Sequence, residues 1–421
     1  MSIKQIKRPT SEANFINDSG LREKVSTILS EIQNKGDTAL FNFCEKFDGF
    51  KGESLKVSTK QIESAYESLD TEIIQAIKIA ARRIEQFAQV QKEAILPREV
   101  ELSPGITLGH HILPVSSSAS YVPGGRYPLP SSALMSIIPA RVAGVKRIVA
   151  CSPPDRSIES INPATLVAMD IAGAHEIYCM GGAHAIGALA FGSESIAPAD
   201  IIVGPGNQWV TEAKRQVSGD VGIDFIAGPS EVLIIADSTA NPKFIAADLL
   251  AQSEHDTQAR GILISTNEKL IHSVLGYLEE FLEQLPTAPV ARKAWEDNGE
   301  IYLVDYLEEA VNLSDEIAPE HLELHISNPD AIVPKLNNYG SLFIGNWAAE
   351  VLGDYVSGTN HILPTMRAAR YTGGVWVGTF LKVVSYQKIT QEGARELAPV
   401  ASKLAELEGL YAHKLAADLR R

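Results

Sequence analysis

Apolar positions in the first hundred residues recur with the period of an α-helix. One apolar stripe, with offsets typical of a single helix face, consists of Leu21, Val25, Ile28, Leu29 and Ile32. Residues 58–98 continue in the same style. The pattern predicts a helical N-terminal region.

From Arg147 onward, short β-branched runs alternate with apolar-faced helical stretches, which predicts βαβ units around parallel sheets. The expected strands are residues 148–151, 176–179, 201–203, 232–236, 261–265, 301–304 and 341–344. The expected helices include residues 163–171, 207–217, 241–255 and a C-terminal helix over 394–420. We expect two α/β sheets, with a break near Gly228-Pro229.

Composition excludes several classes of protein. A chain of 421 residues is long enough for two or three domains, and three widely spaced cysteines exclude a disulfide scaffold or a multi-thiolate zinc finger. A net charge of −15 without a Lys/Arg cluster argues against nucleic-acid binding. No apolar run approaches the roughly 20 residues of a membrane-spanning helix. The polar start predicts no secretory signal, so we expect a cytoplasmic protein.

Four glycine-containing loops precede or follow the predicted strands: residues 121–126, 180–184, 204–207 and 227–230. Ligands of open α/β sheets bind beyond the carboxyl ends of the strands, where glycine lets the backbone approach them closely. None of the loops has the spacing of a GxGxxG fingerprint or a P-loop. Each could be a simple turn, but together they predict a ligand cleft.

Several polar side chains could hold a metal. Gln252 and His255 are three residues apart and could converge on one ion from one helix face. Asp354 and His361 lie in a glycine-containing segment that could offer further ligands. A solvated helix end and a surface loop are the alternatives. Because thiolates are scarce, a metal here would have nitrogen and oxygen ligands, which suits a catalytic Zn²⁺ with exchangeable positions.

The pair Glu320-His321 follows a proline turn and could supply a water-activating carboxylate and an imidazole base at one place. A favourable Glu at a helix N-terminus is the alternative interpretation. Glu408 and His413 lie five residues apart in the predicted C-terminal helix, where a histidine is usually just exposed.

Seven segments, in this order, resemble histidinol dehydrogenases from about residue 20 to the C-terminus. They are PGG at 123–125, GPGNQWVTEAKRQV at 204–217, AGPSEVLIIAD at 227–237, DLLAQSEHD at 248–256, APEHLEL at 318–324, GDYVSGTNHILPT at 353–365 and EGLYAH at 408–413. The resemblance implies a zinc- and NAD-dependent alcohol dehydrogenase that forms an intertwined homodimer. Such an enzyme oxidises a primary alcohol through an aldehyde to a carboxylate, here best L-histidinol to L-histidine.

The resemblance also implies roles for single residues. The implied zinc ligands are Gln252, His255, Asp354 and His413, with His413 arriving from the second chain. The implied acid–base pair is Glu320 and His321. The implied substrate contacts are Ser230, Gln252, His255, His321, Asp354, His361, Glu408 and His413. The implied NAD contacts are Tyr121, His184 and Asn207, although His184 stands where the family has a glutamine.

Three alternatives to a histidinol dehydrogenase remain open. Residues 101–105, 123–127 and 369–382 look more like a sister branch, the sulfopropanediol 3-dehydrogenases, where Arg126 or Arg367 could pair with a sulfonate. An aldehyde dehydrogenase with a cysteine nucleophile would need an accessible, activated thiol, which neither Cys151 nor Cys179 suggests. A non-catalytic binding protein would be favoured by the loss of any implied zinc ligand.

With this resemblance we divide the chain into four parts. Residues 1–18 are an N-terminal arm, and residues 376–421 are a helical tail. Residues 19–119 and 230–375 together form a first, discontinuous α/β domain. Residues 120–229 form a second α/β domain on the NAD side. Both α/β domains are expected to be Rossmann-like.

Overall fold

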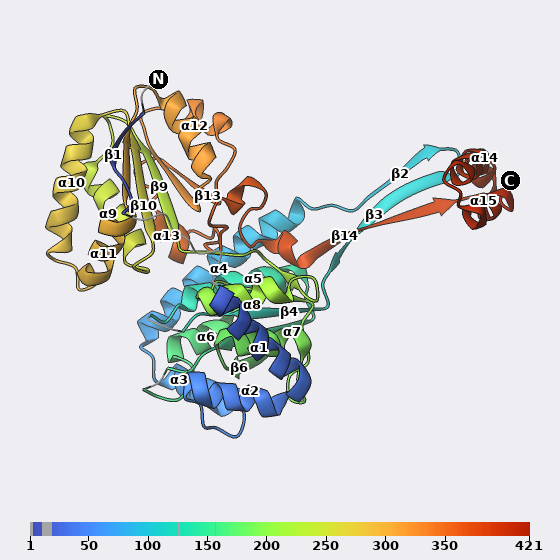
Figure 1. Ribbon diagram of the computed structural model, residues 1–421, viewed down its shortest axis with the longest axis horizontal. Coiled ribbons are helices and arrows are strands. Elements are labelled where there is room, and N and C mark those ends of the chain that lie inside the picture. Colours follow the sequence, from blue (N-terminus) through green and yellow to red (C-terminus); the bar gives the residue numbers. More distant parts are fainter. Residues whose placement is uncertain (1–2, 11–18, 125–126, 156) are drawn as a thin grey trace.

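The computed structural model describes residues 3–10, 19–124, 127–155 and 157–421. Two α/β lobes lie side by side, and a long arm extends from the second lobe to the C-terminal helices (Figure 1). The expected α/β class with parallel sheets is confirmed. Each of the seven expected strands is present within one residue of its expected ends.

The first lobe contains a six-stranded sheet in the order β1-β11-β10-β9-β12-β13. Its strands are β1 (Lys4–Lys7), β9 (Glu231–Ala236), β10 (Arg260–Ser265), β11 (Glu300–Leu303), β12 (His321–His325) and β13 (Ser341–Ile344). Its helices are α9 (Pro242–Ser253), α10 (Glu268–Leu282), α11 (Ala288–Asn298), α12 (Leu307–Ile317) and α13 (Glu350–Tyr355). All pairs are parallel except β1 with β11, so the expected N-terminal arm includes an antiparallel edge strand.

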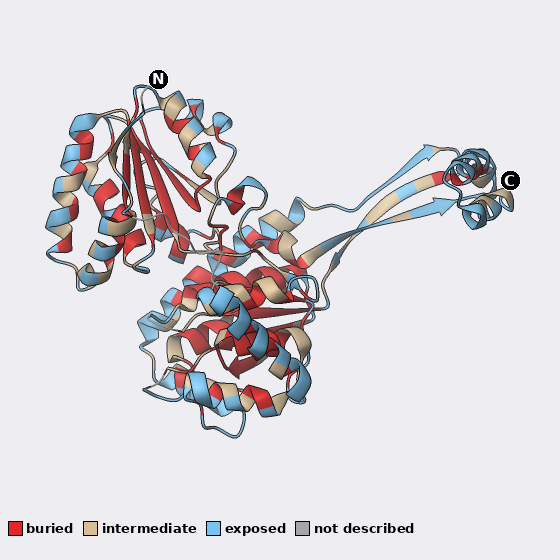
Figure 2. Ribbon diagram, in the orientation of Figure 1, coloured by how far each residue is buried: buried red, intermediate tan, exposed pale blue. Residues whose placement is uncertain are grey.

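The central strand β9 is buried along its whole length, as Figure 2 shows for this sheet. Its side chains alternate between two cores: Val232 and Ile234 pack with α9, α10 and α11, while Leu233 and Ile235 pack with α12 on the other face. A parallel sheet covered by helices on both faces needs such an unbroken apolar run. This explains why the strand was visible in the sequence.

The second lobe contains a five-stranded parallel sheet in the order β6-β5-β4-β7-β8. Its strands are β4 (Ser117–Tyr121), β5 (Arg147–Ser152), β6 (Glu176–Cys179), β7 (Ile201–Val203) and β8 (Gly222–Ile223). Its helices are α1 (Ser19–Lys35), α2 (Asp37–Phe43), α3 (Thr59–Glu67), α4 (Thr71–Glu93), α5 (Pro130–Ala143), α6 (Pro163–Ala172), α7 (Gly182–Phe191) and α8 (Gln208–Val217).

The packing of the N-terminal helices differs from the expected division. We expected residues 19–119 to belong with residues 230–375, but Val25 of α1 and Ile84 of α4 are buried in the core of the second lobe. Ile362 and Val375 join the same core. An apolar stripe shows that a helix must be covered, but it does not show which sheet covers it.

The arm is a three-stranded antiparallel sheet in the order β14-β3-β2, made of β2 (Arg98–Ser103), β3 (Ile106–Pro114) and β14 (Leu381–Ile389). It was not expected, and the expected helical tail of residues 376–421 therefore contains a nine-residue strand. Figure 2 shows the arm mostly exposed. Without a buried face, these strands lack the alternation that marks a strand in a sequence.

Two helices follow β14 at the end of the arm, α14 (Gln391–Leu407) and α15 (Tyr411–Asp418), where one helix was expected. The break occurs at Gly409, which has a φ of 75°. Such a left-handed conformation is easy for glycine and ends a helix. Among the described residues, no helix is long and apolar enough to cross a membrane.

Candidate active site

A cavity of about 560 Å³ lies between the two lobes. The first lobe contributes Ser230 at the start of β9, the residues that follow α9, the start of β12, and α13. The second lobe contributes the turn between β7 and α8, the segment 225–229, and the beginning of α5. The second lobe thus contributes the carboxyl end of β7, a usual place for ligands in α/β proteins, whereas the first lobe contributes the amino ends of β9 and β12.

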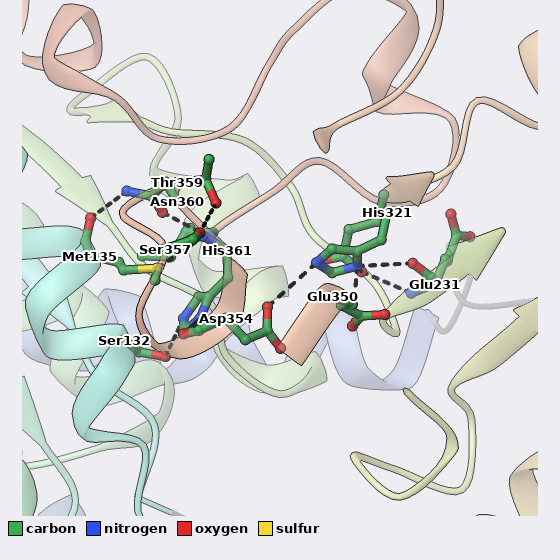
Figure 3. A network of polar contacts seen from close by, with 12 residues as sticks. Ser132, Met135, Glu231, His321, Glu350, Asp354, Ser357, Thr359, Asn360 and His361 are labelled. Carbon is green, nitrogen blue, oxygen red and sulfur yellow. Dashed lines mark hydrogen bonds and ion pairs between the residues drawn. The ribbon is translucent and has the colours of Figure 1, made fainter. Parts of the chain in front are cut away.

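Glu320 and His321 lie at the start of β12 and are both buried. The backbone of Glu231 on the neighbouring strand holds both side chains. Its N–H donates to Glu320 Oε2 at 2.8 Å, and its carbonyl accepts from His321 Nδ1 at 3.1 Å (Figure 3). Because a carbonyl only accepts, Nδ1 carries the proton and Nε2 keeps a free lone pair.

The lone pair on Nε2 of His321 faces the cavity, which His321 helps to line. Among the described residues Nε2 has no hydrogen-bond partner, and it lies 3.7 Å from Asp354 Oδ1. Burial lowers the pKa of His321 from 6.5, so the ring is neutral at neutral pH. Burial raises the pKa of Glu320 well above 4.5, partly offset by the N–H of Glu231. Burial thus shifts the pKa of Glu320 toward neutral pH, where a general acid or base works best, and keeps the His321 ring neutral and able to accept a proton.

Beside this pair, His255, Glu350 and Asp354 bring one ligand atom each to within 4.8 Å of one another. Gln252 lies in α9, whereas His255 follows the end of the helix, so the two residues do not share one helix as expected. The Gln252 side chain nevertheless lies next to Glu350 and the backbone of Glu231. Four of the residues that line the cavity therefore offer nitrogen or oxygen ligands at one place.

His361 completes this side of the cavity. Its Nδ1 donates to the carbonyl of Asp354 at 3.0 Å, and its Nε2 accepts from the Ser132 hydroxyl at 3.0 Å (Figure 3). Burial lowers the pKa of His361. Ser132 lies on α5 of the second lobe, so His361 connects the two lobes next to Asp354. Ser230 also lines the cavity.

The three predicted NAD contacts lie in two different environments. Asn207 lines the cavity, and its side chain caps α8 by accepting from the N–H of Trp209 and of Val210. Tyr121 and His184 are buried and are not among the residues that line the cavity. They lie under the loop after β6, where the Tyr121 hydroxyl accepts from the N–H of Gly182 at 3.2 Å and His184 Nε2 lies 3.0 Å from Asp48.

Two further predicted residues lie far from the cavity within one chain. Glu408 and His413 are exposed and lie on the helices at the far end of the arm (Figure 1). Of the two arginines considered for a sulfonate, Arg367 is exposed and does not line the cavity. Arg126 lies outside the described residues.

The sequence analysis missed Glu231 and Glu350, which are buried against the predicted site. Glu350 could have been found, because it precedes Asp354 by four residues in a short helix and so shares its face. Burial raises the pKa of Glu350 well above 4.5, and the nearby Asp354 adds to this effect. The role of Glu231 comes from its backbone, which leaves no pattern in a sequence.

The cysteines do not offer a nucleophile. Cys44, Cys151 and Cys179 are all buried. Burial raises the pKa of each of the three thiols far above 9. A thiol in such surroundings is unreactive, which argues against the alternative of a cysteine-dependent aldehyde dehydrogenase.

The family model for histidinol dehydrogenase matches residues 12–421. The chain belongs to the histidinol dehydrogenase family. The resemblance found in the sequence is thereby confirmed, and the chain is an enzyme, a dehydrogenase of this family.

Relatives in this family match nearly end to end. A histidinol dehydrogenase homolog of Shouchella clausii is 45% identical over 416 residues, which is 99% of this chain and 98% of that protein. A histidinol dehydrogenase of Methanocaldococcus jannaschii is 44% identical, with 98% and 97% covered. The crystal structure of histidinol dehydrogenase from Elizabethkingia anophelis is 42% identical and superimposes with a TM-score of 0.92, covering 99% of this chain and 94% of that one.

Proposed function

We propose that this protein oxidises L-histidinol through the aldehyde to L-histidine with two NAD⁺ and a catalytic zinc ion. One observation carries the proposal: a buried acid–base pair, Glu320 and His321, faces a cluster of nitrogen and oxygen ligands inside one cavity. Family membership supplies the reaction class.

The donor set fits zinc. Gln252, His255 and Asp354 are the proposed ligands from one chain, and Zn²⁺ in catalytic sites takes three protein ligands or more with nitrogen and oxygen atoms. Asp354 Oδ1 is buried and, among the described residues, has no hydrogen-bond partner. The Gln252 side-chain amide can point either its nitrogen or its oxygen towards Glu350, and a bound cation would favour the oxygen. A zinc ion at this place would supply Lewis acidity to the substrate oxygen.

His321 is the proposed base of the first oxidation. Its free Nε2 accepts the hydroxyl proton of the substrate while the hydride leaves carbon for NAD⁺, and the Glu231 carbonyl stabilises the imidazolium that results. In the second oxidation the aldehyde must first add water. The carboxylate form of Glu320 takes a proton from that water, and the raised pKa of the group makes this form a stronger base. Once His321 has released its first proton to solvent, the hydrate gives it a hydroxyl proton and transfers a hydride to a second NAD⁺, which leaves the carboxylic acid.

Of the three predicted cofactor contacts, Asn207 is proposed as a direct contact, whereas Tyr121 and His184 are proposed to act indirectly. Asn207 contacts the dinucleotide directly, since it lines the cavity beside the start of α8. Tyr121 and His184 act on the same side of the molecule by holding the loop after β6.

We further propose a homodimer whose sites are shared between chains. Glu408 and His413 would reach the cavity of the second copy, with His413 as the fourth zinc ligand and Glu408 as a substrate contact. In support, the helices that carry them expose Leu407, Tyr411 and Leu415, which are 83%, 69% and 60% accessible in the single chain. Apolar side chains at such exposure are typical of a surface that another chain covers.

NADH formation with L-histidinol and with dihydroxypropanesulfonate, measured side by side, tests the substrate. Four-electron oxidation of L-histidinol, seen as two NADH per alcohol, is the expected result. Turnover of only the sulfonated diol would overturn the histidinol proposal. Arg367, one of the two arginines considered for a sulfonate, lies outside the cavity and does not support that alternative.

A further inference from the structure

A buried ion pair lies directly behind the cavity wall of the second lobe. Lys214, on α8, and Asp224, which follows β8, have side chains only 3% and 1% exposed, and the ammonium lies 2.5 Å from Asp224 Oδ1. Neither residue lines the cavity. Burying two charges is costly unless each is fully paired, so the position of this pair requires an explanation.

The ammonium of Lys214 is not available to a ligand. It donates to the carbonyl of Gly204 at 2.8 Å as well as to Asp224, and it lies 5.9 Å from the ring centroid of Phe225. A lysine has only three N–H donors, and these contacts enclose the group. Lys214 therefore does not act as a phosphate-binding lysine.

The pair instead fixes the backbone of the cavity wall. While the Gly204 carbonyl accepts from Lys214, the Gly204 N–H donates to Asp224 Oδ2 at 2.8 Å. The other oxygen, Oδ1, accepts from the N–H of Phe225 at 2.8 Å. One ion pair thus holds the turn after β7 and the segment after β8 at a fixed separation.

The backbone conformation of the turn at Gly204 is tightly constrained. Its φ is 114°, and a Cβ there would lie 2.1 Å from the carbonyl oxygen of Tyr121. Only glycine allows this combination of a positive φ and a close backbone approach. Because the turn is packed this tightly, both backbone groups of Gly204 need partners on the buried side, and the ion pair supplies them.

The fixed backbone carries part of the cavity lining. Pro205, Gly206, Asn207 and Phe225 all line the cavity, and Asn207 begins α8 as its N-cap. This is the carboxyl end of a parallel strand followed by a helix N-terminus, an arrangement that binds the diphosphate of dinucleotides. The lysine and the cap lie on the same helix, so the pair also sets the position of that N-terminus.

We propose that Lys214 and Asp224 are positioning residues for the dinucleotide, an inference that rests on the proposed NAD dependence. The pair keeps the turn 204–208 and Phe225 at the spacing that the cofactor requires. It acts on cofactor binding and leaves the zinc ligands and the acid–base pair of the first lobe untouched.

The test compares two variants with the wild-type holoenzyme. Lys214→Met removes the ammonium, and the double variant Lys214→Met/Asp224→Leu removes both charges, so that no unpaired charge stays buried. We expect the Kd and KM for NAD⁺ to rise about 10- to 100-fold in both, since small misplacements of binding groups have effects of this size. The KM for the alcohol and the zinc content should stay within about twofold.

Arg147→Met is the matched control for a purely structural role. Arg147, at the amino end of β5, forms an ion pair with Glu176 at 2.7 Å and donates to the carbonyls of Ala197 and Pro198, in the same lobe but outside the cavity lining. We expect it to lower the melting temperature without changing the Kd for NAD⁺. If it weakens NAD⁺ binding as much as the Lys214 variants do, the positioning role is refuted.

The outcomes separate this inference from the proposed function. A wild type that binds NAD⁺ but does not oxidise L-histidinol refutes the substrate, and the Kd values of the variants still decide the inference. An unchanged Kd in the double variant overturns the inference and leaves the proposed function intact. A wild type that does not bind NAD⁺ overturns both. If Lys214→Met does not fold, the double variant decides.

Discussion

The side chain of Glu231 makes the pH dependence of stability predictable. Its backbone holds the acid–base pair, but its carboxyl group is buried, and within the described residues Oε2 has no hydrogen-bond partner. Arg260 lies 3.8 Å from the other oxygen. Burial raises the pKa of Glu231 from 4.5 to about 7, an effect that Arg260 only partly offsets.

The magnitude follows from these two pKa values. In the unfolded chain Glu231 ionises near pH 4.5, whereas in the folded protein it holds its proton up to about pH 7. Between these values the unfolded state binds fewer protons, so the free energy of unfolding falls as the pH rises. Below pH 4.5 the contribution is fully present, and above pH 7 it is lost. An interval of about 2.5 pH units at about 1.4 kcal/mol each gives about 3.5 kcal/mol.

Glu231→Gln removes this titration. We expect the stability of the variant relative to wild type to increase by up to about 3.5 kcal/mol between pH 4.5 and pH 8. Urea unfolding of the metal-free protein, followed through the fluorescence of its four tryptophans, measures this difference across that range. A difference between variant and wild type that does not change with pH would refute the reasoning.

The matched control is Glu300→Gln. Glu300 is a buried carboxyl group at the start of the neighbouring strand β11, but it is ion-paired with Arg260 at 2.6 Å. Replacing a paired buried carboxylate leaves Arg260 without its closest partner. This variant should therefore be less stable than wild type at pH 8, the opposite sign from Glu231→Gln.

Three further predictions concern the reaction. His255→Ala should lose bound zinc by metal analysis and lose NADH formation, and full activity without metal would remove the zinc assignment. Glu320→Gln should slow oxidation of the aldehyde about 10²- to 10⁴-fold while substrate binding changes little, and an unchanged aldehyde rate would exclude Glu320 as the base for water. Equal amounts of His413→Ala and His255→Ala chains, each inactive alone, should regain about a quarter of wild-type activity in exchanged dimers. No recovery in demonstrated heterodimers would place each site in a single chain.

Parallel strands could be predicted most directly where nearly every residue is apolar, although β12, with the sequence HLELH, is buried as well while every second residue is polar. Strands such as β9 and β10 run between two layers of helices, and their sequences VLIIA and GILIS have no polar face. The arm could not be predicted in this way. Strand β14 has only two half-buried positions in nine, so its sequence does not show which residues pair with which.

Residues of the site could be predicted where they lie close together in the sequence. Glu320-His321 and the pair Gln252 and His255 stand close together in the chain, so their proximity in space could be expected. Glu231 was not predictable, because its contribution to the site is a peptide N–H and a carbonyl. For Tyr121 and His184 the sequence motif identifies the residues but not their role. It does not show whether a residue contacts the ligand or supports a loop next to it.

His413 lies far from the cavity of its own chain, so in the proposed dimer it would have to serve the cavity of the other chain. A dimer with a twofold axis is reciprocal, so an arm that reaches the partner's cavity leaves its own cavity to be completed by the partner's arm. Neither chain would then hold a complete zinc site alone, and assembly and activity would be lost together on dilution. The exposed apolar residues at the end of the arm, such as Leu407 and Leu415, would be buried in the same step. Burial of these apolar side chains would thus help to hold His413 in place at the metal site of the other chain.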